Sequence, residues 1–357
     1  MNLDGRVAVT GDDLGQIKVI DVGNCKVVFQ ASISSRDDQR KVAITHLCSR
    51  GASDNFVICT SDGAVHQLLN FRDVATVPGN LKGGTVGIGE LDERRALFCS
   101  PAGEVFFLQD EKLIPSSMKV GNNVQCMQTS RHERILSVAG KEHELELWDL
   151  QHEKSTFRAK NVASDELGLR VPVDNRCIAF ASEKDTRIVA VGTGLGRLRL
   201  YDTRCGQRRP VQDLDTSLNR RNGIPSACTA IDVWNRGESG TVVVATGDGD
   251  LRAFDLRSKQ VQGVFRGHSG SIKTIRSHQS DPLLASGGFS RFLLIHDVIS
   301  RAQLAKVYMI NRVMGVVWAP ETAAKHLVSK RSTEVNLSRE SSLTHSDSKK
   351  RRSESSS

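Results

Sequence analysis

The sequence lacks any long apolar run. Nowhere does it approach the ~20 consecutive apolar residues that a helix needs to span a bilayer. Its first ten residues, MNLDGRVAVT, also lack the charged and then apolar order of a secretory signal. Hydrophobic residues still make up 38% of the 357 residues and charged residues 25%, which is typical of a soluble chain with a buried core. We therefore expect no membrane partner and no secretion.

Closely spaced cysteine pairs are also missing. The sequence contains no C-x-x-C pair, which argues against a zinc site and against a small disulfide-rich scaffold. We expect the cysteines to be small buried side chains of a protein that stays in a reducing compartment. The eight are Cys25, Cys48, Cys59, Cys99, Cys126, Cys177, Cys205 and Cys228.

Motifs with a known catalytic mechanism are absent as well. No G-x-S-x-G, P-loop or H-E-x-x-H occurs. The spacing of Gly192, Gly194 and Gly196 suggests a dinucleotide-binding loop, but no helix pattern follows to point its N-terminus at a phosphate. These glycines are better explained as the turn of a β-hairpin. The sequence thus predicts a protein with no enzymatic activity, no metal and no cofactor.

One unit is repeated seven times along the chain. Each copy is an apolar run, a small-residue step, a polar turn and a second apolar run, often with a closing Asp. The copies end at intervals of 48, 40, 40, 53, 53 and 42 residues, a period that is typical of propellers and other repeat folds. Their sequences are VAVTGDDLGQIKVID, VICTSDGAVHQLL, ALFCSPAGEVFFLQ, LSVAGKEHELELWD, VAVGTGLGRLRLYD, VVVATGDGDLRAFD and LLASGGFSRFLLIHD.

Each copy has the properties of a β-hairpin. In the sixth, Val242, Val243 and Val244 favour a strand, and Gly247 and Gly249 supply turn residues that tolerate positive φ. Both faces of the runs are apolar, so each sheet must be covered on both sides. Two further strands per sheet are expected from the stretches between hairpins. These features predict an all-β fold, a seven-bladed β-propeller that spans residues 1–318.

The ends of the repeat region predict how the ring closes. The first hairpin begins at about Val7 and leaves no room for a complete strand before it. After the last hairpin comes another apolar run, Val313–Trp318. Because an unpaired sheet edge is a liability, we expect this run to pair with the first hairpin and complete the first blade.

From residue 319 onward the composition changes. The last 39 residues contain eleven serines and no aromatic residue, too little apolar surface for a core, so 319–357 is predicted to be a disordered basic tail. Its basic run is Lys349, Lys350, Arg351 and Arg352. Such a run is typical of a nuclear import signal or a nucleic-acid contact, and equally of a solvated chain end. The net charge of +8 favours acidic partners such as RNA.

One segment does not follow the repeat. FRAKNVASDELGLRVP, residues 157–172, lies in one of the two longest intervals, between the fourth and fifth copies. We expect an outer strand at 155–160, a loop, and an inner strand over 169–180, with the loop on a rim of the propeller where partners often bind. A plain connection does not explain its mixed charges, which are Arg158, Lys160, Asp165, Glu166 and Arg170.

The repeats resemble WD repeats. In the last copy, Gly267 and His268 stand where that family has Gly-His, and Trp148 and Asp149 keep the full Trp-Asp dipeptide in the fourth. The other copies lack the dipeptide, and Ser290 stands where a turn Asp is expected. The hydrogen-bonded His–Asp pairing of the family is therefore expected to be mostly absent.

A narrower resemblance follows from FRAKNV and LRVP after a LELWDL blade, QRRPV at 207–211 and KVY at 306–308. These segments are similar to the nucleolar WD-repeat assembly factors of the large (60S) ribosomal subunit. The resemblance implies a non-catalytic scaffold of the nucleus and nucleolus that binds pre-ribosomal large-subunit particles and other ribosome assembly factors. It also implies release by an AAA-type ATPase, and a monomer within a larger assembly.

In that setting the charged rim is the expected partner-binding site. The planar donor fork of arginine suits phosphate and carboxylate partners. Contacts to phosphate position a protein without reading sequence, so an rRNA contact stays open beside a contact with an acidic protein, which the two acids of the loop favour. The expected contact residues are Arg158, Lys160, Asp165, Glu166, Arg170, Arg208 and Arg209.

A second function stays open. The repeat endings YDTR and FDLR resemble those of substrate receptors of cullin-based ubiquitin ligases. There, Arg204 and Arg257 would contact an adaptor. An arginine after the closing Asp can also simply pair with a nearby acid.

Overall fold

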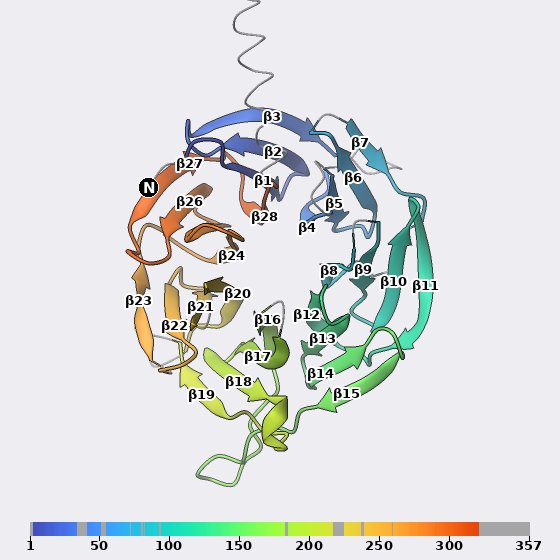
Figure 1. Ribbon diagram of the computed structural model, residues 1–357, viewed down its shortest axis with the longest axis vertical. Coiled ribbons are helices and arrows are strands. Elements are labelled where there is room, and N and C mark those ends of the chain that lie inside the picture. Colours follow the sequence, from blue (N-terminus) through green and yellow to red (C-terminus); the bar gives the residue numbers. More distant parts are fainter. Residues whose placement is uncertain are drawn as a thin grey trace, which may run out of the picture.

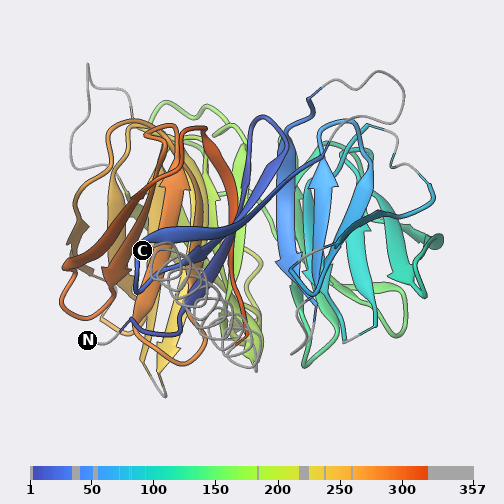
Figure 2. The same cartoon turned by 90° about the horizontal axis from the view of Figure 1, so that it is seen from above.

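The computed structural model describes residues 3–320 except 34–40, 51–54, 72, 80, 82, 93, 183–184, 217–224, 237–238 and 259. Over these residues the chain forms seven four-stranded antiparallel sheets arranged in a ring (Figure 1). Seen from the side, the strands run between the two faces of a disc (Figure 2). The predicted seven-bladed propeller is confirmed.

The strands of blades 1 to 4 follow one another from the inner to the outer edge of each sheet. Blade 1 is β28 (Val313–Trp318), β1 (Val7–Asp12), β2 (Gln16–Asp21) and β3 (Lys26–Ser32). Blade 2 is β4 (Ile44–Ser49), β5 (Phe56–Thr60), β6 (Val65–Leu69) and β7 (Asp73–Thr76). Blade 3 is β8 (Gly87–Glu90), β9 (Ala96–Cys99), β10 (Glu104–Gln109) and β11 (Lys112–Lys119). Blade 4 is β12 (Val124–Ser130), β13 (Ile135–Gly140), β14 (His143–Asp149) and β15 (Lys154–Arg158).

Blades 5 to 7 have the same order. Blade 5 is β16 (Asn175–Ser182), β17 (Asp185–Thr193), β18 (Arg197–Asp202) and β19 (Gln212–Asp215), with a short 3-10 helix, η1 (Thr203–Cys205), after β18. Blade 6 is β20 (Cys228–Arg236), β21 (Ser239–Thr246), β22 (Leu251–Asp255) and β23 (Val261–Phe265). Blade 7 is β24 (Ile272–Ser277), β25 (Leu283–Gly288), β26 (Phe292–Asp297) and β27 (Gln303–Tyr308).

The seven repeated hairpins form the second and third strands of the blades. Their small-residue step has a packing role that is clear at two glycines. A Cβ on Gly11 would lie 2.5 Å from Cγ2 of Ile44 in the next blade, and a Cβ on Gly287 would lie 2.6 Å from Cγ1 of Val313. Neither distance is sterically possible, so these positions let adjacent blades approach closely.

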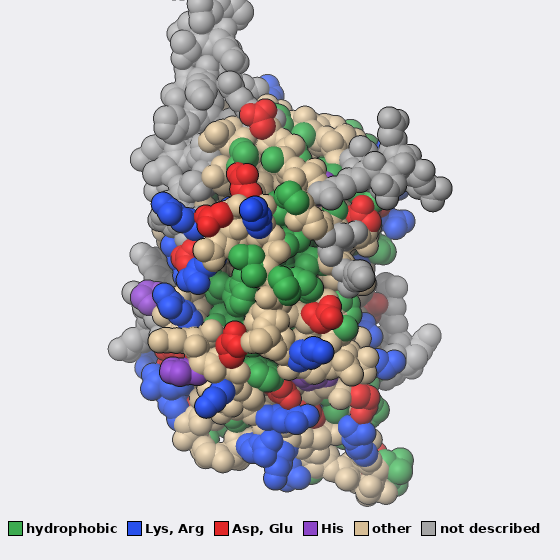
Figure 3. Space-filling model, turned by 90° about the vertical axis from the view of Figure 1, so that its right-hand side faces the viewer, with side chains coloured by type: hydrophobic (Ala, Val, Ile, Leu, Met, Phe, Trp, Pro, Cys, Tyr) green, Lys and Arg blue, Asp and Glu red, His purple; other side chains and the backbone are tan. Residues whose placement is uncertain are grey.

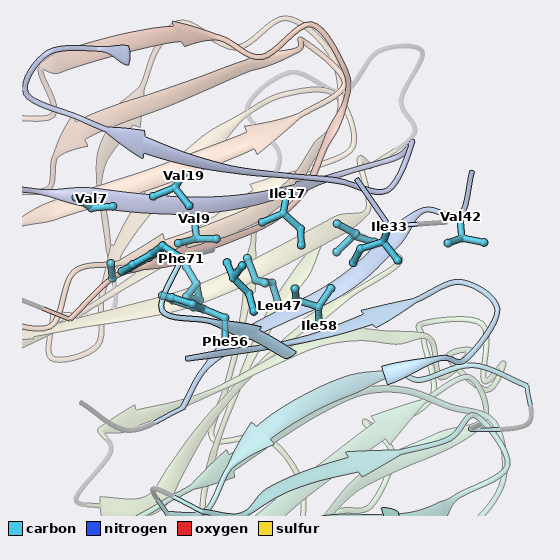
Figure 4. Packing of buried hydrophobic residues seen from close by; sticks show 14 residues of the cluster. Val7, Val9, Ile17, Val19, Ile33, Val42, Leu47, Phe56, Ile58 and Phe71 are labelled. Carbon is cyan, nitrogen blue, oxygen red and sulfur yellow. The ribbon is translucent and has the colours of Figure 1, made fainter. Parts of the chain in front are cut away.

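The hydrophobic core is divided among the spaces between neighbouring sheets. Buried apolar residues form seven clusters in the described part of the chain, one for each pair of adjacent blades. Figure 4 shows the cluster between blades 1 and 2, where Val9 and Ile17 face Phe56 and Ile58. Because each sheet is covered on both sides, its two middle strands are apolar on both faces, whereas the outer strands such as β7 and β15 are largely exposed.

The ring closes as predicted, through the last strand of the propeller. β28 pairs antiparallel with β1, with Val317 opposite Val9, and the amide of Ala319 donates to the carbonyl of Val7 at 2.9 Å. The buried Lys18 of β2 donates through Nζ to the carbonyl of Met309, just before β28, and lies 3.7 Å from the Asp12 carboxylate. A buried charge therefore joins the two ends of the propeller.

The His–Asp pairing of WD repeats is replaced in blade 7 by two serines, in line with the sequence. Nε2 of His268 lies 2.8 Å from Oγ of Ser286, and its Nδ1 lies 3.2 Å from Oγ of Ser290. Burial lowers the pKa of His268 to about 4. The ring is thus a neutral bridge between the hydroxyls.

Two details of the sequence-based predictions are wrong. The inner strand of blade 5 begins at Asn175 rather than at residue 169. The carbonyl of Val171 accepts a hydrogen bond from the side chain of Asn161, and Pro172 has no amide hydrogen to donate to a sheet. Cys25 and Cys205 are exposed, since Cys25 lies in a turn and Cys205 in η1, both outside the sheets. All eight thiols are free, and five of them are buried.

Within the described residues, no helix is long and apolar enough to cross a membrane. Over the same residues, no three His, Cys, Asp or Glu side chains gather as a metal site would require. The predicted tail and its basic run, Lys349, Lys350, Arg351 and Arg352, lie outside the described residues.

Candidate partner-binding site

The segment that departs from the repeat is the connection from β15 to β16, residues 159–174. It projects beyond the ring between blades 4 and 5 (Figure 1). Seen from the side of β10 and β11, Lys and Arg side chains gather at the end of the molecule nearest β15 (Figure 3). We name this connection the rim loop.

The rim loop is tied to the connection between β18 and β19. The amide of Lys160 donates to the carbonyl of Arg208 at 2.8 Å. In return, Nε of Arg208 donates to the carbonyl of Arg158 at 2.5 Å, and Nε of Arg209 donates to that of Asn161 at 3.1 Å. The structure thus brings the two predicted basic segments together. Arg208 and Arg209 each use one guanidinium donor to bind a backbone carbonyl of the first segment.

Arg158 is held by an acid of its own blade. Its Nε lies 2.9 Å from Oε1 of Glu146 on β14, whose side chain is only 9% exposed, whereas that of Arg158 is 70% exposed. Nε1 of Trp148 donates to the other Glu146 oxygen at 3.1 Å. The arginine compensates a nearly buried carboxylate, so its first role is structural, although its outer side still meets water.

Arg170 also has an internal partner. Its Nη2 lies 2.7 Å from Oε2 of Glu142, in the turn between β13 and β14, and both side chains are exposed. The amide of Glu142 donates to the carbonyl of Val173 at 2.9 Å, so this turn and the end of the loop are held together. An exposed ion pair of this kind contributes less than about 1 kcal/mol.

Asp165 organises the tip of the loop. One of its carboxylate oxygens accepts from the amides of Leu167 at 2.9 Å and Leu169 at 2.8 Å. Its own amide donates to the carbonyl of Leu169, and its carbonyl accepts from the amide of Gly168, which has a φ of 77°. The carboxylate is therefore a turn cap, and it fixes two leucines that the sequence-based prediction of charged contacts had missed.

Within the part of the chain that the structure describes, two of the predicted contact residues have side chains that form neither an ion pair nor a hydrogen bond. Among the described residues, neither Lys160 nor Glu166 has an ion-pair partner, and both are exposed. Lys160 lies at the start of the loop and Glu166 at its tip. The seven predicted residues thus lie on two segments that are hydrogen-bonded to each other, and most of their side chains have an internal partner.

A cleft of about 640 Å³ lies beneath the rim loop, against blade 5. Val162, Val171 and Pro210 give it apolar walls. Its floor is basic, with two arginines that share one carboxylate. Nε of Arg197 lies 2.7 Å from Oδ1 of Asp213, and Nε of the buried Arg199 lies 3.5 Å from Oδ2 of the same carboxylate. The cleft is continuous with the site because Arg209 also lines it.

A half-buried acid lies at the junction of blades 4 and 5. Burial raises the pKa of Glu144, and the positive charges of Arg199 and Arg170 oppose that shift. The phenol of Tyr201 in the same region has its pKa raised by burial as well. These groups are parts of the packed junction on which the rim loop rests.

The arginines of the YDTR and FDLR endings lie next to their own aspartates. Arg204 forms a two-point ion pair with Asp202, with Nε–Oδ1 at 2.9 Å and Nη2–Oδ2 at 2.7 Å. The amide of Arg257 donates to Oδ1 of Asp255 at 2.7 Å. Arg204 therefore has the geometry of an arginine that pairs with a nearby acid.

Comparison with known proteins shows relatives along most of the chain. WD repeat-containing protein 74 of Bos taurus is 32% identical over 317 residues, which cover 85% of this chain and 78% of the relative. The Homo sapiens protein of that name is 32% identical over 288 residues, 77% of this chain and 71% of the relative. Ribosome biogenesis protein NSA1 of Yarrowia lipolytica is 26% identical over 261 residues, 65% of this chain and 63% of the relative. No family model matches the chain.

The first two similarities combine about one-third identity with coverage of more than two thirds of both chains. The seven-bladed ring agrees with the WD repeats in their names. This chain therefore belongs to the family of WD repeat-containing protein 74.

Proposed function

We propose that the protein acts in ribosome biogenesis as a non-catalytic scaffold that binds nucleolar precursors of the large ribosomal subunit. The similarity to chains named ribosome biogenesis protein NSA1 is the observation that carries this proposal. The fold is compatible with it, because a closed ring with a core between every pair of blades is a rigid body that presents loops without changing shape.

The partner-binding site in this proposal is the rim loop with residues 207–211. The loop and this segment contain six of the seven contact residues expected from the sequence, and the seventh, Arg158, ends β15 directly before the loop. The exposed sides of Arg158 and Arg170 remain able to meet a carboxylate or amide group of a protein partner. Lys160, Arg208 and Arg209 are the exposed cations best placed for an rRNA phosphate, because no described acid pairs with them. Contacts of this kind hold the protein on a particle and require no catalysed reaction.

Co-sedimentation tests the proposal. The tagged full chain is expressed in cells, and the lysate is separated on a sucrose gradient. We expect the chain in fractions that contain large-subunit precursors, together with ribosome assembly factors after affinity purification. A chain that stays at the top of the gradient, with no assembly factor bound, would show that the proposed function is wrong.

We also propose that an AAA-type ATPase releases the protein from the particle. Particles isolated through the tag are incubated with a cell extract and either ATP or a non-hydrolysable ATP analogue. We expect ATP to move the chain into the unbound fraction and the analogue to leave it on the particle. Equal release with both nucleotides would contradict this part of the proposal.

The nuclear and nucleolar location is proposed to depend on Lys349, Lys350, Arg351 and Arg352. A fluorescent fusion that lacks the last ten residues should lose nuclear accumulation, because a basic run is what import receptors recognise. The matched control replaces the last five residues, which follow the basic run, with alanine. Unchanged accumulation after the deletion would remove the import role.

The alternative function as a substrate receptor of a cullin-based ubiquitin ligase receives no support from the geometry. Arg204 is occupied by Asp202 in a two-point ion pair. Affinity purification of the tagged chain separates the two functions, since a cullin adaptor in place of assembly factors would favour the ligase.

A further inference from the structure

The tip of the rim loop presents apolar side chains, although the loop stands out in the sequence for its charges. Leu167 is 82% exposed and Leu169 61% exposed, and Leu167 is the most exposed of the large hydrophobic side chains in the described residues. Single exposed apolar residues need no explanation. Two that are held close together at the end of a projecting loop do need one.

The backbone of the tip is fixed before any partner arrives. One carboxylate oxygen of Asp165 accepts hydrogen bonds from the amides of both leucines. The main chain of Asp165 also forms hydrogen bonds with Leu169 and Gly168. Gly168 has the positive φ that this turn requires. Because the turn is already formed, little backbone entropy is lost when the leucines are buried against a partner.

The base of the loop is fixed as well. Hydrogen bonds to Arg208 and Arg209 tie its first residues to blade 5, and the Arg170–Glu142 pair ties its last residues to blade 4. The tip therefore stands on two anchors, one on each blade. A projection with this support can enter a pocket without rearrangement of the ring.

The charges around the tip disfavour RNA as its immediate partner. Glu166 adjoins Leu167, Asp165 uses its carboxylate in the turn, and Arg170 is paired with Glu142. Phosphate binding needs uncommitted cations. The one that the loop offers is at its base, away from the two leucines, so the tip itself presents apolar surface and a negative charge.

We propose that Leu167 and Leu169 insert into an apolar pocket of a folded protein in the large-subunit precursor. This inference rests on the proposed function, because that particle supplies the partner. The charged residues of the loop then act as its supports, and the two leucines make the contact that is lost when the partner dissociates.

Photo-crosslinking on purified particles tests the identity of the partner. A photoreactive phenylalanine analogue replaces Leu167 in one variant and Ile299 in another. Ile299 is a matched control, because it is 56% exposed and its amide donates to Asp297 in a similar turn of blade 7. We expect the Leu167 variant to give an adduct with one ribosome assembly factor or ribosomal protein, which mass spectrometry identifies. An adduct with RNA, or none beyond that of the Ile299 variant, would overturn the inference.

A second pair of variants measures the contribution of the leucines. Leu167→Ser with Leu169→Ser should reduce the particle-bound fraction at least about tenfold, since each leucine loses the transfer free energy of a buried side chain. Ile299→Ser should leave it unchanged, and the melting temperature should stay constant in both. Full binding by the double variant would contradict the inference and leave the proposed function unaffected. If the wild-type chain fails to sediment with particles, the proposed function is wrong, and this inference fails with it.

Discussion

Nε of Arg158 lies 2.9 Å from Oε1 of Glu146, on neighbouring strands of blade 4. Arg158→Glu would place a second carboxylate against one that is nearly buried. We expect it to lower the free energy of unfolding by about 2 kcal/mol, since one partner of a partly buried pair is removed and a like charge is added. Chemical denaturation measures this. Lys160→Glu is the control and should change stability little, and equal effects of the two changes would contradict the structural role of Arg158.

Variants of Asp165 distinguish two roles for its carboxylate, a turn cap and a charged contact with a partner. Asp165→Asn keeps the oxygen that accepts from Leu167 and Leu169 but removes the charge. We expect this variant to bind particles within about twofold of the wild type, whereas Asp165→Ala should bind several-fold more weakly because the turn loosens. Co-sedimentation provides the measurement. Loss of binding by Asp165→Asn would instead assign the carboxylate to the interface.

Lys18 is expected to stabilise the closure of the ring. Lys18→Met removes the donor to the Met309 carbonyl and leaves Asp12 without its nearby cation. The expected loss is about 3 kcal/mol, as for other buried ion pairs broken on one side. Hydrogen exchange should show faster opening of β28 and β1 than of blade 4. Lys26→Met, on the exposed outer strand, is the control, and uniform exchange in Lys18→Met would argue against a local effect.

Acid should destabilise the propeller through two histidines. Burial lowers the pKa of His46 and of His268 from 6.5 to about 4. The unfolded chain binds these protons below pH 6.5 and the folded chain only near pH 4, so the contribution to stability is present above pH 6.5 and is lost as the pH falls to about 4. Each shift corresponds to about 3 kcal/mol at most, and to less where solvent screens a residue that is only partly buried, as both are.

Urea denaturation at about pH 7 and about pH 4.5 measures this loss. The double variant His46→Gln with His268→Gln should lose less stability between the two pH values than the wild type, even if it is less stable at neutral pH. Identical pH dependence in the two chains would mean that other groups are responsible.

The architecture could be predicted because its signals are local and repeated. Each hairpin carries its own apolar runs and turn, and the period of the copies gives the number of blades. The closure by β28 followed from a simple count, since the first blade lacked a strand and one apolar run was left over. Nothing in either step required knowledge of side-chain contacts.

The partners of the rim-loop charges could not be predicted. Glu146 faces Arg158 only because the ladder between β14 and β15 has an irregularity at Leu147 and Trp148, which shifts the register. A register set by such a bulge is not readable from residue spacing. The leucine tip is different, since Asp165 followed by Gly168 is a turn signal that could have directed attention to the side chains between them.

The pairing of β28 with β1 also has a consequence for synthesis on the ribosome. About 300 residues separate the two strands. At roughly 5–20 residues per second, β1 is therefore synthesised about 15–60 seconds before β28. During that interval the edge of β1 is open to any other extended polypeptide. A cell that makes this protein must shield the emerging N-terminal strand until translation reaches the C-terminal one.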